Sequence, residues 1–151
     1  TGPTGATGTI TTVAGTFFDF QTGPFNNGDI LPVSTESSVN TPGFTVVGGG
    51  VQVTNGGLYL ADGRVQINSG SQATVGLQIN GGGIFVPYFN AGGASSPAGS
   101  ATVIIVINAI LSLNPGDIVS LGLITGGPVT LESAIGGTIT PTTAIRLVKI
   151  N

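Results

Sequence analysis

The chain has 151 residues, of which 3 are Lys or Arg, 6 are Asp or Glu, and none is His or Cys. Charged residues make up 6% of the chain, against about 25% in ordinary globular proteins, while 40% of the residues are hydrophobic. This balance predicts one folded domain whose surface consists of uncharged polar side chains and backbone. Nucleic acids and anionic membranes both require clustered cations, so the three basic residues exclude these partners.

The missing residue types also exclude most catalytic machinery. Without His or Cys, one chain cannot form a Ser-His-Asp or Cys-His nucleophile system, and zinc lacks its preferred ligands. The glycine runs at 48–50 and 81–83 lack the Lys and the helix of a phosphate-binding loop. We therefore expect no enzyme and no cofactor. Calcium, which takes oxygen ligands, stays open at Asp62 or Asp117, although solvated turn residues are the better interpretation of both.

The first residues have a period of three. Gly2, Gly5 and Gly8 fall at every third position, and only Gly fits the crowded axis of a collagen triple helix. Because the period stops at Thr11, we expect residues 1–9 to be the end of a collagen-like stalk and residues 10–151 to be a C-terminal head. Thr4 and Thr7 occupy the outward Y positions of the triplets and are candidates for O-glycosylation.

The rest of the chain is rich in Val, Ile, Thr and Phe and has no capped helical period, which predicts an all-β fold. Turn signals such as Asn55-Gly56, Asp62-Gly63, Asn114-Pro115-Gly116-Asp117 and Gly136-Gly137 separate short strands, as in a sandwich or barrel. The expected strands are 12–20, 51–54, 57–60, 64–68, 74–80, 84–89, 101–113, 118–125 and 143–150.

The segment 103–107 is apolar at every position, whereas a strand with one wet face should alternate. One face can fill the core of a sandwich, but no helix is expected that would cover the other. The simplest cover is a second copy, and a three-stranded stalk makes the assembly a threefold trimer. We assign Val103, Ile105 and Ile107 to the trimer interface. The alternative is a central strand covered by loops within a monomer.

Two motifs resemble a known family. The run from Leu111 to Val119 is similar to the Leu-x-x-Gly-Asp-x-Val hairpin of globular heads related to complement C1q and tumour necrosis factor. Gly57-Leu58-Tyr59 resembles the Gly-x-Tyr opening of an inner strand in that family, and the last apolar segment lies where its last strand lies. The resemblance implies a homotrimeric jelly-roll sandwich that nucleates a stalk, without catalysis.

The triplets with Thr at the Y position resemble the collagen-like glycoproteins of the bacterial spore exosporium, of the BclA type. This implies a structural protein of the outer spore layer, extracellular, whose partners are its own copies and other spore-surface proteins. The alternative is a glycan- or receptor-binding adhesin or a phage fibre tip. For that function Tyr88 is the candidate ligand contact, in a Gly- and Ser-rich loop over 87–100.

Overall fold

The computed structural model describes residues 12–81, 90–96 and 102–151, and within them every regular element is a β-strand. In these ranges no helix is long and apolar enough to span a bilayer. The strands are β1 (Ala14–Asp19), β2 (Ile30–Leu31), β3 (Thr35–Glu36), β4 (Phe44–Val47), β5 (Gly50–Val53), β6 (Gly57–Ile67), β7 (Gln72–Ile79), β8 (Asn90–Ser95), β9 (Val103–Leu113), β10 (Ile118–Thr125), β11 (Ala134–Ile135), β12 (Thr138–Ile139) and β13 (Thr143–Lys149).

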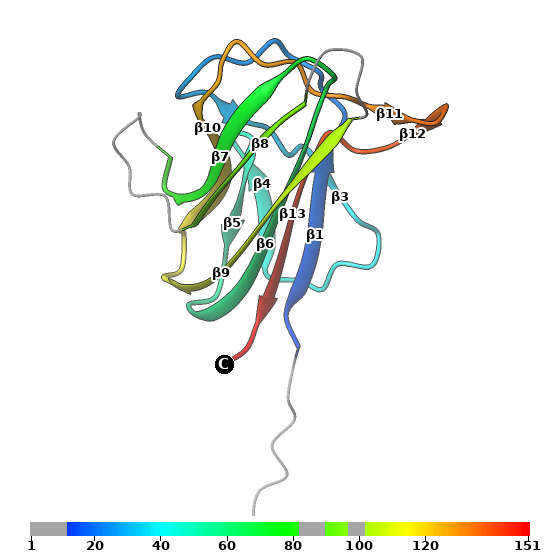
Figure 1. Ribbon diagram of the computed structural model, residues 1–151. Helices are drawn as coiled ribbons and strands as arrows, with labels where there is room; N and C mark the ends of the chain where they lie inside the picture. The colour runs from blue at the N-terminus through cyan, green and yellow to red at the C-terminus, as the bar shows by residue number, and fades with distance from the viewer. Residues whose placement is uncertain (1–11, 82–89, 97–101) are drawn as a thin grey trace, which may run out of the picture.

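Two antiparallel sheets pack against each other as a sandwich, and β11 and β12 form a separate two-stranded sheet (Figure 1). The first sheet has the order β3-β1-β13-β6-β9, and the second has the order β4-β5-β10-β7-β8, with β2 added to β10. The chain crosses repeatedly from one sheet to the other, which is the jelly-roll arrangement. The all-β prediction is therefore confirmed. Alternate side chains of each sheet, such as Phe17, Tyr59, Leu77 and Leu121, fill the space between them and are fully buried.

The predicted turn at Asp62-Gly63 is wrong, because both residues lie inside the eleven-residue strand β6. Gly63 serves packing instead. A Cβ atom at this position would lie 2.7 Å from Leu121 Cδ2 and 3.4 Å from Leu77 Cδ2 of the facing sheet. A glycine within a strand commonly marks such a close approach. Asp-Gly is a typical turn sequence, but here its glycine allows the two sheets to pack closely.

Strand β9 shows which of its two apolar faces fills the core. Ile105 and Ile107 are 4% and 2% exposed and belong to the core, and Val103 is half-buried against it. The assignment of these three residues to a trimer interface is therefore corrected: they point into the sandwich of their own chain. Ile104, Val106 and Ile110 point the other way and are 42%, 60% and 65% exposed. The expectation of a second apolar face holds, but for the opposite set of side chains.

The turn between β9 and β10 has the expected form. Gly116 has φ +92°, the N–H of Asp117 donates to the carbonyl of Asn114 at 3.1 Å, and Pro115 occupies the first corner, as in a type II turn. Asp117 accepts hydrogen bonds from the Asn114 N–H at 2.8 Å and from Asn80 Nδ2 at 2.7 Å. The aspartate thus links its own turn to the end of β7.

The segment 90–95 was expected to be part of a loop and is instead the edge strand β8. Its small residues permit a close contact, since a Cβ atom on Gly92 would lie 3.1 Å from Ile105 Cγ2 of β9. The strand expected at 84–89, the stalk residues 1–9 and Tyr88 lie outside the described residues.

Candidate functional site

The outer face of the β3-β1-β13-β6-β9 sheet carries the exposed apolar side chains of β6 and β9. Residues that lie directly opposite each other on antiparallel strands point to the same side of the sheet. Leu60 of β6 pairs with Ile110 of β9 and with Val148 of β13, and Val148 in turn pairs with Ala14 of β1. One row of four apolar residues therefore crosses four strands.

We call Leu58, Leu60, Ile104, Val106 and Ile110 the apolar face. All five are large hydrophobic residues that stay exposed in the single chain. They gather on two adjacent strands, which distinguishes them from the isolated exposed hydrophobics that any soluble protein has. Exposed apolar side chains that gather in this way are typical of a protein–protein contact.

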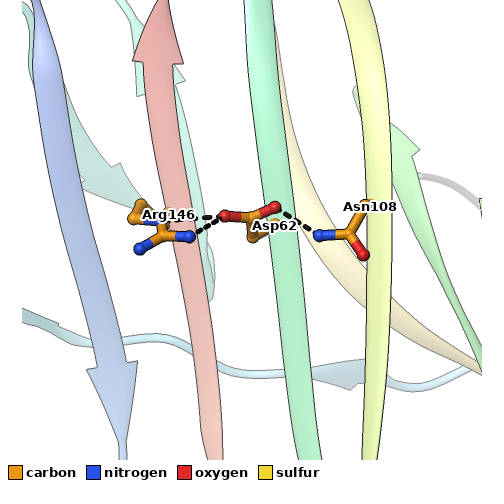
Figure 2. A network of polar contacts seen from close by, with 3 residues as sticks. All are labelled: Asp62, Asn108 and Arg146. Atoms are coloured by element: carbon orange, nitrogen blue, oxygen red, sulfur yellow. Dashed lines mark hydrogen bonds and ion pairs between the residues drawn. The ribbon is translucent and has the colours of Figure 1, made fainter.

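A polar row divides this face. The register aligns Thr16 of β1, Arg146 of β13, Asp62 of β6 and Asn108 of β9. Figure 2 shows Asp62 between Arg146 and Asn108. The Arg146 guanidinium donates from Nε to Asp62 Oδ2 at 2.8 Å and also from Nη2, and Asn108 Nδ2 donates to Asp62 Oδ1. Arg146 and Asp62 form the one ion pair found within the described part of the chain.

Arg64 lies in the next row, opposite Val106 of β9 and Ala144 of β13. Its guanidinium donates to Gln66 Oε1 at 3.1 Å, and it makes no ion pair in the ranges that the structure describes. Gln66 itself is fully buried, and its amide donates to the Glu132 carbonyl and to Thr140 Oγ1. An open depression of about 360 Å³ lies between Thr16, Arg64, Val106 and Arg146. The face is thus apolar with a fixed polar centre.

The calcium candidates Asp62 and Asp117 both have hydrogen-bond partners within the single chain. Both carboxylate oxygens of Asp62 accept hydrogen bonds from Arg146 and Asn108, and both oxygens of Asp117 accept hydrogen bonds from Asn80 and Asn114. No group of three acidic or other metal-binding side chains occurs within residues 12–81, 90–96 and 102–151. Thr4, Thr7 and Tyr88 lie outside those ranges.

The sequence analysis did not identify any of the five residues of the apolar face, nor Arg146 in the polar row that divides it. The signal was present in β9, where Ile104, Val106 and Ile110 share one parity. The sequence alone does not say whether the odd- or the even-numbered residues of β9 face outward. Only the pairing of β9 with Leu60 and Arg64 of β6 shows which side chains share the outer side of the sheet. Arg146 meets Asp62 only through the pairing of β6 with β13, 84 residues apart in the chain.

Comparison with known proteins identifies the fold. A tumour necrosis factor, Eiger from S. frugiperda, superimposes with a TM-score of 0.67 and 18% identity, covering 93% of each chain. Murine APRIL gives a TM-score of 0.66 and 15% identity over 93% of this chain and 100% of its own. The globular domain of zebrafish complement 1qA gives 0.61 and 14% over 92% of this chain and 96% of its own.

The chain therefore has the C1q/TNF-like jelly-roll fold, as the motifs at 57–59 and 111–119 implied. No family model and no curated protein matches the sequence itself. At identities below one fifth, these structures show the architecture.

Proposed function

We propose that this domain is a self-associating head, in which three copies pack together through the apolar face and no reaction is catalysed. The carrying observation is the set of exposed Leu and Ile side chains on β6 and β9, on a chain with only 6% charged residues. Covering such side chains is favourable because it removes apolar area from water. Further copies of the same chain, arranged about a threefold axis, provide a cover without any other protein.

The number three is supported by the collagen-like triplets and by the fold. Triple helices contain three chains, and Gly2, Gly5 and Gly8 carry that period. The resemblance to C1q and tumour necrosis factor heads implies the same number. The Eiger and zebrafish complement 1qA structures have the same architecture as this chain.

The position of Ala14, where the chain enters the sandwich, supports a role in stalk assembly. Ala14 pairs with Val148, so β1 begins at the end of the sandwich where β13 finishes (Figure 1). Both residues lie in a row of the sheet that carries the apolar face. Three heads that pack through this face would bring three preceding segments together, which raises their local concentration and favours a triple helix.

In the same proposal, the head belongs to the surface of a bacterial spore, and Thr4 and Thr7 carry O-glycans. Support comes from the Gly-Pro-Thr and Gly-Ala-Thr triplets. The composition also suits an exposed coat, because the chain contains no Cys, Met or Trp side chain that could be oxidised. Intact-mass analysis of native material tests the glycans: a mass that fits unmodified threonines contradicts this part.

Molar mass in solution tests the proposed self-association. Size exclusion with light scattering, followed by sedimentation equilibrium at sub-micromolar concentration, should give three times the chain mass of 14.8 kDa. A mass of one chain at all concentrations contradicts the proposal and makes a monomeric binding module the better interpretation. A mass of two chains contradicts the threefold arrangement.

A further inference from the structure

The apolar side chains cannot by themselves specify how a second copy is placed. Hydrophobic contact is non-directional, and Leu, Ile and Val side chains of similar size occur on both sides of the polar row. A copy shifted or rotated on this face would bury a comparable apolar area. A unique assembly therefore needs a second kind of interaction within the same face.

The polar row supplies fixed hydrogen-bonding groups at its centre. Asp62 has both oxygens engaged by Arg146 and Asn108, so it holds the guanidinium in one orientation. Arg146 directs Nε and Nη2 at Asp62, and in the described ranges no acceptor is found for its Nη1 group. The side chain of Arg146 is 62% exposed, so water reaches this group in the single chain.

Covering the face removes that water. A buried guanidinium donor without an acceptor is strongly unfavourable, whereas a partner that presents a carbonyl, amide or carboxylate oxygen satisfies it. Placements that leave the Nη1 donors unpaired are thereby rejected. Specificity in protein contacts commonly arises from such a penalty for wrong arrangements, and a single polar residue in an apolar interface can define register.

We infer that the Asp62–Arg146–Asn108 row determines the specificity of the apolar face: Arg146 must meet an acceptor on a second copy of this chain, and this requirement selects one placement. The inference rests on the proposed self-association and adds the residues that orient it. Asp62 and Asn108 are positioning residues, because they act through the guanidinium of Arg146.

A charge swap separates this function from a purely internal ion pair. The double variant Asp62→Arg/Arg146→Asp keeps opposite charges on adjacent strands, and Asn108 can pair with either because its amide both donates and accepts. Within one chain the swap preserves the pair. Between chains it places a carboxylate opposite the partner's acceptor, where the guanidinium should be.

We expect the swapped variant to unfold at the wild-type midpoint at a concentration where both are single chains, measured by circular dichroism. By sedimentation equilibrium, its concentration of half-dissociation should rise at least tenfold. The control is Thr45→Arg, which adds a charge to an exposed position of β4 in the other sheet and should assemble like the wild type.

Each result has one meaning. If the swapped variant forms trimers as tightly as the wild type, the row acts only within the chain and the inference is overturned, while the proposed self-association stands. If the wild type itself is a single chain, the proposed function fails first. If the swapped variant has a lower unfolding midpoint than the wild type, the variant Arg146→Lys tests the inference in its place. Lys keeps the charge but has no second planar donor group, so unchanged trimer affinity in that variant also overturns the inference.

Discussion

The substitution Ile110→Asp tests the apolar face at its most exposed large residue on β9. Ile110 is 65% exposed and lies in a row with Leu60, Val148 and Ala14, none of which can pair with a carboxylate. Val106 is less suitable because it lies opposite Arg64, which would neutralise a new aspartate. In the single chain we expect a change in stability of about 0.5 kcal/mol or less, as for other exposed positions.

In the assembly the same change buries three carboxylates. If each unpaired buried charge costs about 3 kcal/mol, the trimer loses about 9 kcal/mol in its free energy of formation. The concentration of half-dissociation scales as the square root of the trimer's dissociation constant, so it should rise about a thousandfold.

Sedimentation equilibrium over a wide concentration range measures this shift, and circular dichroism confirms that the variant is folded. Thr45→Asp, on the exposed side of β4, should leave both quantities unchanged. Ile105→Asp should instead unfold the chain, because Ile105 lies in its own core. An Ile110→Asp variant that assembles like the wild type would show that Ile110 is not buried between the copies.

Three further predictions concern the fold. Gly63→Val should lower the free energy of unfolding by about 1–3 kcal/mol in thermal melts, because its Cβ would lie 2.7 Å from Leu121 Cδ2; wild-type stability would contradict the close packing. Gly116→Val should cost about 1–3 kcal/mol in the same assay through its φ of +92° alone, since nothing lies within 4 Å; an unchanged midpoint would rule out the turn geometry. Burial raises the pKa of the Tyr59 hydroxyl, which donates to the Asn55 carbonyl, above 10.0. Because the unfolded tyrosine ionises first, stability should fall as the pH rises above about 10, and Tyr59→Phe should reduce that fall in urea titrations across the pH range.

The strand pattern could be predicted from the sequence because side-chain alternation and turn residues are local signals. The strand at Ile118–Thr125 has the expected bounds, and Asn114-Pro115-Gly116-Asp117 forms the expected turn. The turn prediction at Asp62-Gly63 failed because an Asp-Gly pair occurs both in turns and where two sheets approach closely. Only the position of Leu121 in the folded chain shows that the second case applies here. Strand β8 was hidden by its small residues, which favour a loop locally but fit against β9.

The sequence predicted that β9 has a second apolar face, but it did not identify the side chains that form it. An entirely apolar strand indicates that both faces are covered, yet it does not say which face belongs to the chain's own core. That choice depends on long-range pairing: Leu60 and Arg64 of β6 lie beside Ile110 and Val106 only in the folded sheet. The ion pair of Asp62 with Arg146 has no local signal at all, since the two residues are 84 positions apart.

The most direct test of assembly through the apolar face is the reactivity of a cysteine placed on that face. The chain has no Cys, so Ile110→Cys and the control Thr45→Cys each introduce a single thiol. We predict that the Ile110→Cys thiol reacts slowly with a maleimide at concentrations where the mass is that of three chains and rapidly after dilution to single chains. The Thr45→Cys thiol should react equally fast at both. Equal, fast reaction of Ile110→Cys in the three-chain assembly would contradict assembly through the apolar face, because it would show that another surface holds the copies together.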